Sequence, residues 1–128
     1  MLVDAFEKRT VAASDFSHRA HIAVAVSYLQ DLPLDQALDR MRRNLLAFAA
    51  HYQLENLYHE TLTTFWMRLL AHLVTHSDAN LPLWQRINRI VADWGNRRPI
   101  QAHYSEQLIA SREARQTWIE PDRLPLSF

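Results

Sequence analysis

The chain has 128 residues, a length typical of a single domain that can bury a substantial core. Its 14 basic and 14 acidic residues give a formal net charge of zero, so it lacks the basic excess of a nucleic-acid-binding domain, and we expect no nucleic-acid partner. Hydrophobic residues make up 48% of the chain and charged residues 22%, which is ordinary globular usage and argues against disorder.

The chain contains one glycine and no cysteine. A single glycine argues against a sheet protein, because hairpins and bulges depend on glycine. The lack of cysteine excludes disulfides and thiolate metal ligands. No apolar run approaches the roughly 20 residues that span a bilayer, and the N-terminal segment lacks the apolar core of a signal peptide. We therefore expect a cytoplasmic protein with no membrane partner.

Five apolar-periodic segments predict helices, and no strand-like alternation competes with them. The first helix is expected from about residue 15 to residue 30, with Ser14 or Asp15 as its N-cap. The second follows Pro33, which suits a first helical turn because its missing N–H costs nothing there. The apolar stripe of this second helix repeats at helical spacing and consists of Leu34, Leu38, Met41, Leu45, Phe48 and Tyr52.

The third and fourth helices follow the same pattern. The third is expected over roughly residues 57–75. The fourth begins after Asn80, with Pro82 in its first turn. Gly95 is expected to end it as a left-handed C-cap.

The C-terminal tail predicts one or two short helices that end before Pro121, with Ser105 and Ser111 as caps. Its last stretch is expected to be extended and to pack over the other helices. Four long helices and this tail predict an all-α fold. We expect a four-helix-bundle-like single domain spanning residues 1–128, with a short helical, partly extended C-terminal appendage.

Three histidines lie near the starts of predicted helices, His18 and His21 in the first helix and His59 in the third. At 100° per residue, His18 falls in the apolar stripe of its helix and His21 about 60° to one side. His59 falls within about 40° of the stripe of its own helix. Histidine is the commonest metal ligand and the usual general base near neutral pH, so this placement predicts a functional site.

The expected topology places these three histidines in one layer. Short connections predict an up-down-up-down bundle, in which the first and third helices run parallel. The starts of both helices then lie at the same end of the bundle. We expect an aromatic and polar surround from Phe48, His51, Tyr52 and Trp94, with Trp94 as the pocket wall.

The histidine layer predicts a metal site. Helix N-termini favour neutral imidazole, which is the form that binds metal. Three neutral nitrogens with an open position describe a catalytic zinc site. We predict a divalent ion, zinc or iron, on His18, His21 and His59, although nickel, copper and manganese also bind histidine. Glu60 is a candidate fourth ligand or general base, and Tyr58 a candidate assisting hydroxyl.

His72 and His76 form a second pair with ligand spacing, at i and i+4. They lie 13 and 17 residues beyond His59, or about 20 to 25 Å along a helix, so they cannot join the first group. Their position at a helix C-terminus favours imidazolium, and a capping role is expected.

Three segments carry a resemblance that covers most of the chain. FSHRAHIAVA, YHETLTTFWMRL and HYSEQLIASREARQTWIEPDRLPL are similar to segments of an uncharacterised family of small helical bacterial proteins. The resemblance implies a helical fold and brings no activity with it. The expected architecture also resembles that of the DinB-like metal-dependent enzymes, whose ligand spacing is not matched here.

The leading hypothesis from the sequence is a metal-binding helical protein. On this hypothesis it is a metal-dependent hydrolase or oxidoreductase that acts on a small molecule. The alternative is a non-catalytic ligand-binding or protein-interaction bundle whose histidines are structural. Association into a homo-oligomer stays open under both hypotheses.

Overall fold

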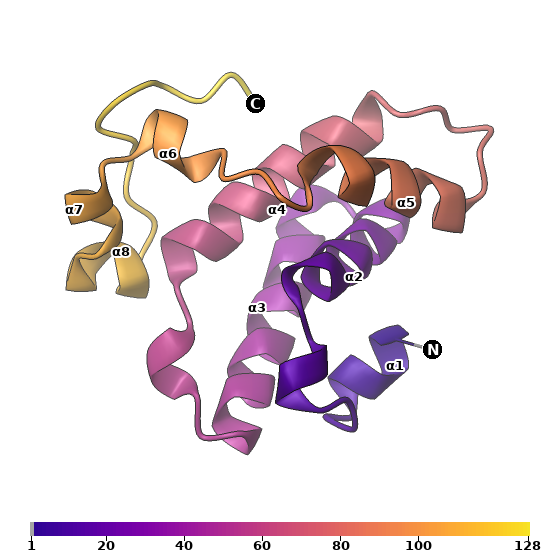
Figure 1. The fold of residues 1–128 in the computed structure, drawn as a ribbon, viewed down its shortest axis with the longest axis horizontal. Coiled ribbons are helices and arrows are strands. Elements are labelled where there is room, and N and C mark those ends of the chain that lie inside the picture. The colour runs from indigo at the N-terminus through magenta and orange to yellow at the C-terminus, as the bar shows by residue number, and fades with distance from the viewer. Residues whose placement is uncertain (1) are drawn as a thin grey trace.

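The computed structural model describes residues 2–128, and within this range the protein is helical and contains no strand (Figure 1). The predicted all-α fold is confirmed. The elements in chain order are α1 (Leu2–Glu7), a 3₁₀ turn η1 (Ala13–Asp15), α2 (His18–Asp31), α3 (Leu34–His51), a 3₁₀ turn η2 (Glu55–Leu57), α4 (Glu60–Thr75), α5 (Leu83–Trp94), α6 (Ile100–His103), α7 (Glu106–Ile109) and α8 (Arg112–Gln116).

α2 is the central helix of the protein. It contacts α1, α3, α4 and α5. Its buried side chains are distributed around much of its axis and are Ile22, Val24, Ala25, Val26 and Tyr28. A helix that is apolar around most of its circumference belongs in a core. None of the described helices combines the length and the apolar character needed to cross a bilayer.

α1, which the sequence patterns did not predict, is held against α2 and α3 by one carboxylate. The guanidinium of Arg40 donates to both Glu7 oxygens, at 2.7 and 2.9 Å, and the Tyr28 hydroxyl also donates to Glu7. Phe6 beside it is fully buried and stacks on Phe16 with ring centroids 4.4 Å apart. A six-residue helix is too short to be stable alone, so these long-range contacts account for it.

Two of the long helices begin three residues later than predicted. The N-cap of α2 is Ser17, whose hydroxyl accepts from the Ala20 N–H at 3.3 Å, so the expected capping by Ser14 or Asp15 is wrong. Phe16 turns into the core just before this cap and interrupts the helical path. α4 likewise begins at Glu60, because residues 55–57 form the separate turn η2.

The expected roles of two prolines and the glycine also change. Pro33 and Pro82 are the N-caps of α3 and α5 and have extended backbone, so they precede the first turn. Gly95 has φ −62° and ψ −25°, which is right-handed, so the predicted left-handed cap is wrong. Glycine fits this position because the Val91 carbonyl oxygen lies close to it: a Cβ on residue 95 would be only 2.6 Å from that oxygen.

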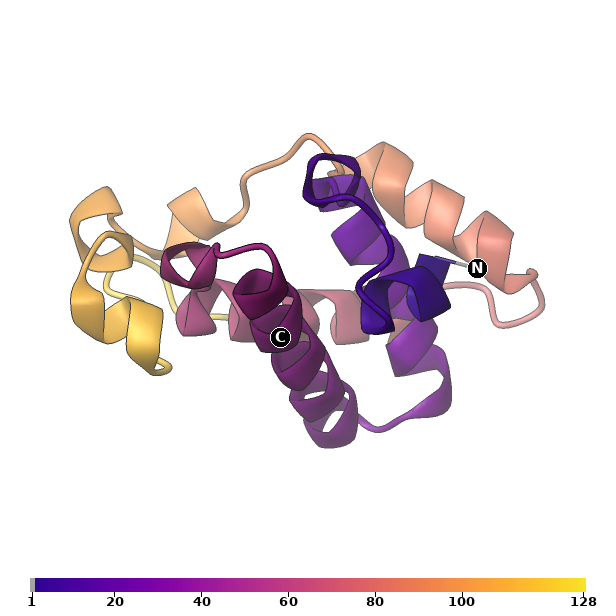
Figure 2. The same cartoon turned by 90° about the horizontal axis from the view of Figure 1, so that it is seen from below.

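The C-terminal appendage packs around α4 and gathers at the end of the molecule remote from α1 (Figures 1 and 2). Ser105 and Ser111 cap α7 and α8 as predicted, each accepting a backbone N–H at 3.1 Å. A second apolar cluster joins the appendage to α4. Its buried members are Phe65, Leu69 and Tyr104, and Trp118, Leu126 and Phe128 are among the residues packed against them.

Candidate functional site

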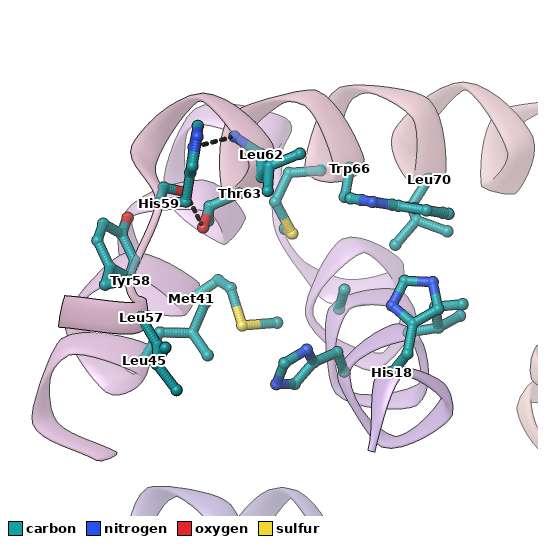
Figure 3. Close-up of a pocket in the computed structure, with 14 residues that line it drawn as sticks. His18, Met41, Leu45, Leu57, Tyr58, His59, Leu62, Thr63, Trp66 and Leu70 are labelled. Carbon is teal, nitrogen blue, oxygen red and sulfur yellow. Dashed lines mark hydrogen bonds between the residues drawn. The ribbon is translucent and has the colours of Figure 1, made fainter. Parts of the chain in front are cut away.

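A pocket of about 270 Å³ lies between α2, α3, α4 and η2 (Figure 3). Most of its lining is apolar: Ile22, Ala25, Met41, Leu45, Leu57, Leu62, Trp66, Met67 and Leu70. The remaining lining residues are polar: His18, His21, Tyr58, His59 and Thr63. All three histidines singled out by the sequence therefore border one pocket.

His18 and His21 lie on the same side of the pocket, in the first turn of α2. The His18 ring packs edge-on against Trp66, with centroids 4.6 Å apart and planes at 71°. The His21 ring packs in a similar way against Phe16, with centroids 4.3 Å apart. In the described part of the chain neither imidazole has a hydrogen-bond partner, so both rings offer their polar atoms to the pocket or to solvent.

Both imidazoles are neutral at pH 7. Burial lowers the pKa of His18 below its usual 6.5. Burial of its ring among neighbouring side chains, reinforced by the proximity of His18, lowers the pKa of His21 to about 4, although His21, like His18, is exposed by its residue surface area. Each ring therefore presents one N–H donor and one lone pair.

His59 has a different role, because it is the N-cap of α4. Its Nδ1 accepts the Leu62 N–H at 3.1 Å, and this fixes the proton of the neutral ring on Nε2. That N–H in turn donates to the Ile109 carbonyl oxygen at 2.8 Å. Both ring nitrogens are engaged and the side chain is buried, so His59 has no nitrogen left for a metal ion.

The three histidines do not converge, which corrects the expected single layer. Figure 3 shows His18 beneath Trp66 and Leu70, while His59 lies at the opposite end of the pocket. Trp66 is seven residues beyond His59, or about 10 Å along α4. The start of α2 thus meets the middle of α4. Across residues 2–128, no three His, Cys, Asp or Glu side chains are grouped to hold a metal ion.

Glu60 belongs to a separate polar network beside the pocket. Its carboxylate accepts from the Arg42 guanidinium at 2.9 and 2.7 Å, from the Tyr58 hydroxyl at 2.6 Å, and from the Thr64 hydroxyl at 3.2 Å. It borders a neighbouring hollow together with Arg42 and Arg115, away from His18 and His21.

This network engages both residues predicted to assist the histidines, Glu60 as fourth ligand or general base and Tyr58 as an assisting hydroxyl. Burial would raise the pKa of Glu60, but the hydrogen bonds and the charge of Arg42 outweigh it and lower that pKa below its usual value. Burial and the hydrogen bond to Glu60 raise the pKa of Tyr58 well above its usual value. A carboxylate that is held ionised by an arginine is a weak base at neutral pH.

The aromatic surround also differs from the predicted one. Trp66 is the aromatic wall of the pocket, whereas Trp94 lies outside it with the Arg97 guanidinium over its ring. Phe48, His51 and Tyr52 do not line the pocket either. Helical spacing alone does not distinguish a pocket-wall residue such as Trp66 from a core residue.

Comparison with known proteins adds no relative. No family model matches the chain, and neither the curated proteins nor the solved structures contain a match to it. The resemblance to a family of small helical bacterial proteins therefore stays a prediction, and the site has to be interpreted from its own geometry.

Proposed function

We propose that the protein binds a small, mostly apolar organic molecule in the pocket, with His18 and His21 receiving its polar group. The observation that carries this proposal is the lining. Nine apolar side chains line the pocket together with two solvent-exposed imidazoles that have no hydrogen-bond partner in the described part of the chain. Ligand sites are typically apolar with a few polar groups that orient the ligand.

The size and charge of the pocket narrow the ligand class. A cavity of about 150 Å³ holds benzene, so a pocket of about 270 Å³ has room for one or two rings. The pKa values of His18 and His21 are lowered, which favours their neutral forms, and neither Glu60 nor Arg42 lines the pocket. These features favour an uncharged ligand. A hydroxylated aromatic compound, whose hydroxyl donates to a free imidazole nitrogen, fits this chemistry best.

The proposal is tested with 2-naphthol as the ligand and naphthalene and 2-naphthoate as its apolar and anionic counterparts. We expect 2-naphthol to bind most tightly and to shift the amide resonances of α2 and α4. The double variant His18→Ala, His21→Ala should bind 2-naphthol a few-fold more weakly, because a lost hydrogen bond costs about 1 kcal/mol. Its affinity for naphthalene should be unchanged.

Two tryptophan variants provide matched controls for this test. Trp66→Ala removes the pocket wall and should abolish binding, whereas Trp94→Phe lies outside the pocket and should not. Equal binding of 2-naphthol to wild type and Trp66→Ala, or resonance shifts confined to another region, would overturn the proposal.

A second candidate function is metal binding by His18 and His21 alone. Their i,i+3 spacing and unengaged nitrogens favour it, with zinc or iron as the ion. The donor set does not fit a catalytic zinc centre, because such centres use three protein ligands and His59 is engaged elsewhere. Elemental analysis of tag-free wild-type and His18→Ala protein tests this candidate. It requires bound metal in the wild type and none in the variant.

A further inference from the structure

The second histidine pair, His72 and His76, lies at the C-terminal end of α4, away from the pocket. The two imidazole rings face each other on successive turns, with centroids 4.3 Å apart and planes at 44°. Both side chains are exposed, so an ion can reach them from solvent.

Their hydrogen bonds orient one ring for coordination. The Nδ1 of His76 lies 2.8 Å from the His72 carbonyl oxygen, an acceptor, so Nδ1 carries the proton and donates. The lone pair of the neutral His76 ring is therefore on Nε2. Histidines that bind metals commonly donate their other N–H to a backbone carbonyl in this way, which fixes the tautomer and the ring orientation.

The other ring is positioned by the C-terminal tail. His72 lies between His76 and Phe128, with centroids 4.3 and 6.1 Å from it. Arg68, one turn earlier on α4, donates to the Phe128 carbonyl oxygen at 3.0 Å and so holds this residue in place. The pair is thus supported by two residues outside it.

We propose that His72 and His76 form a surface site for a late first-row divalent cation, with water completing the coordination. Two imidazoles without a carboxylate or thiolate favour copper, nickel or zinc over calcium or magnesium, and copper is expected to bind most tightly. Arg68 is the nearby cation on the same helix and limits the affinity.

The test titrates Cu²⁺ into tag-free, full-length protein and follows heat and the electron paramagnetic resonance spectrum. We expect a tight site whose spectrum shows two equivalent nitrogen ligands and which depends on His72 and His76. His72→Ala and His76→Ala should each lower the affinity for Cu²⁺ by at least roughly tenfold and leave a spectrum with one nitrogen ligand. Circular dichroism checks that these exposed substitutions leave the fold intact.

Two controls separate this site from other histidines. His51→Ala removes another exposed histidine at a helix C-terminus, one without a neighbouring histidine on its helix, and should leave the affinity unchanged. The double variant with His18→Ala and His21→Ala removes any copper bound at the pocket, so the site that survives in it should be the one assigned to His72 and His76. Loss of the tight site in either control, or its retention when His72 and His76 are both replaced, would overturn the proposal.

Discussion

The His59 imidazole and the Ile109 carbonyl oxygen are joined by a 2.8 Å hydrogen bond that connects the start of α4 to the end of α7. The same ring caps α4 through the Leu62 N–H. One side chain thus joins two segments 50 residues apart and satisfies a helix end at the same time. This bond explains why a histidine directed inward by its spacing is structural, and it leaves the polar chemistry of the pocket to His18 and His21.

Replacing His59 should therefore destabilise the protein. His59→Ala removes the N-cap and leaves the Ile109 carbonyl without its partner, for an expected loss of about 2 to 4 kcal/mol in the free energy of unfolding. His59→Asn can restore the cap without reaching Ile109, so it should lose less. Urea denaturation measures both against His51→Ala, an exposed control. A loss for His59→Ala no larger than that for His51→Ala would contradict this role.

Thr61 is expected to hold the tail after α8. Its side chain is fully buried, and its hydroxyl donates to the Thr117 carbonyl at 2.8 Å and accepts the Ile119 N–H at 3.3 Å. Thr61→Val keeps the shape but leaves both backbone groups unpaired, so we expect a loss of about 1 to 3 kcal/mol. Hydrogen exchange should be accelerated at the Ile119 amide. Thr63→Val is the matched control, because the Thr63 hydroxyl donates to the His59 carbonyl at the start of its own helix rather than to the tail.

The Arg42–Glu60 ion pair should contribute more stability than its exposed neighbour. Glu60→Gln weakens a bidentate, partly buried ion pair, and we expect the free energy of unfolding to fall by about 1.5 to 3 kcal/mol at pH 7. Asp39→Asn affects more exposed pairs with Arg42 and Arg43 and should lose less than about 1 kcal/mol. Because the pKa of Glu60 is lowered, its contribution is present above pH 4.5 and lost as the pH falls further. The two variants should therefore differ in urea denaturation at pH 7, and the difference should shrink as the pH falls below 4.5.

The helices of the core could be predicted because their signals are local. Apolar periodicity located α2 to α5, and the caps at Ser105 and Ser111 depend on residues three positions away. α1 could not be predicted, since it depends on the contact of Glu7 with Arg40, 33 residues later. The role of His59 likewise depends on Ile109, a distant backbone group that no spacing rule identifies.

The site was predicted in part for a related reason. Helical spacing identified His18, His21 and His59, and all three border the pocket. The assumption of nearly parallel helices then placed their rings together. Side-chain packing decides how helices cross, and here it sets His18 against Trp66 rather than beside His59. Periodicity thus predicted which of these residues border the pocket. It could not predict which of their atoms come into contact there.

Filling the pocket should block the proposed ligand without unfolding the protein. Ala25 is buried in α2 and lines the pocket, so Ala25→Leu adds three carbon atoms into existing space. We expect 2-naphthol binding to be lost while the melting temperature changes little. Ala47→Leu adds the same group to α3 outside the pocket and should keep binding. Unchanged 2-naphthol affinity in Ala25→Leu would place the ligand elsewhere.

The neutral state of His21 should appear as a pH dependence of stability. Its pKa is about 4 in the folded protein and 6.5 as a free side chain, mainly because of burial and secondarily because of His18. The unfolded chain therefore binds more protons than the folded one between these values, and stability falls as the pH drops from 6.5 toward 4. His21→Gln cannot titrate, so its free energy of unfolding should fall less steeply over this interval. Urea denaturation at half-unit pH steps compares the two slopes, with His51→Gln as the exposed control. If wild type and His21→Gln have parallel profiles between pH 6.5 and 4, the folded protein accommodates a protonated His21, and the uncharged pocket that favours a neutral ligand is wrong.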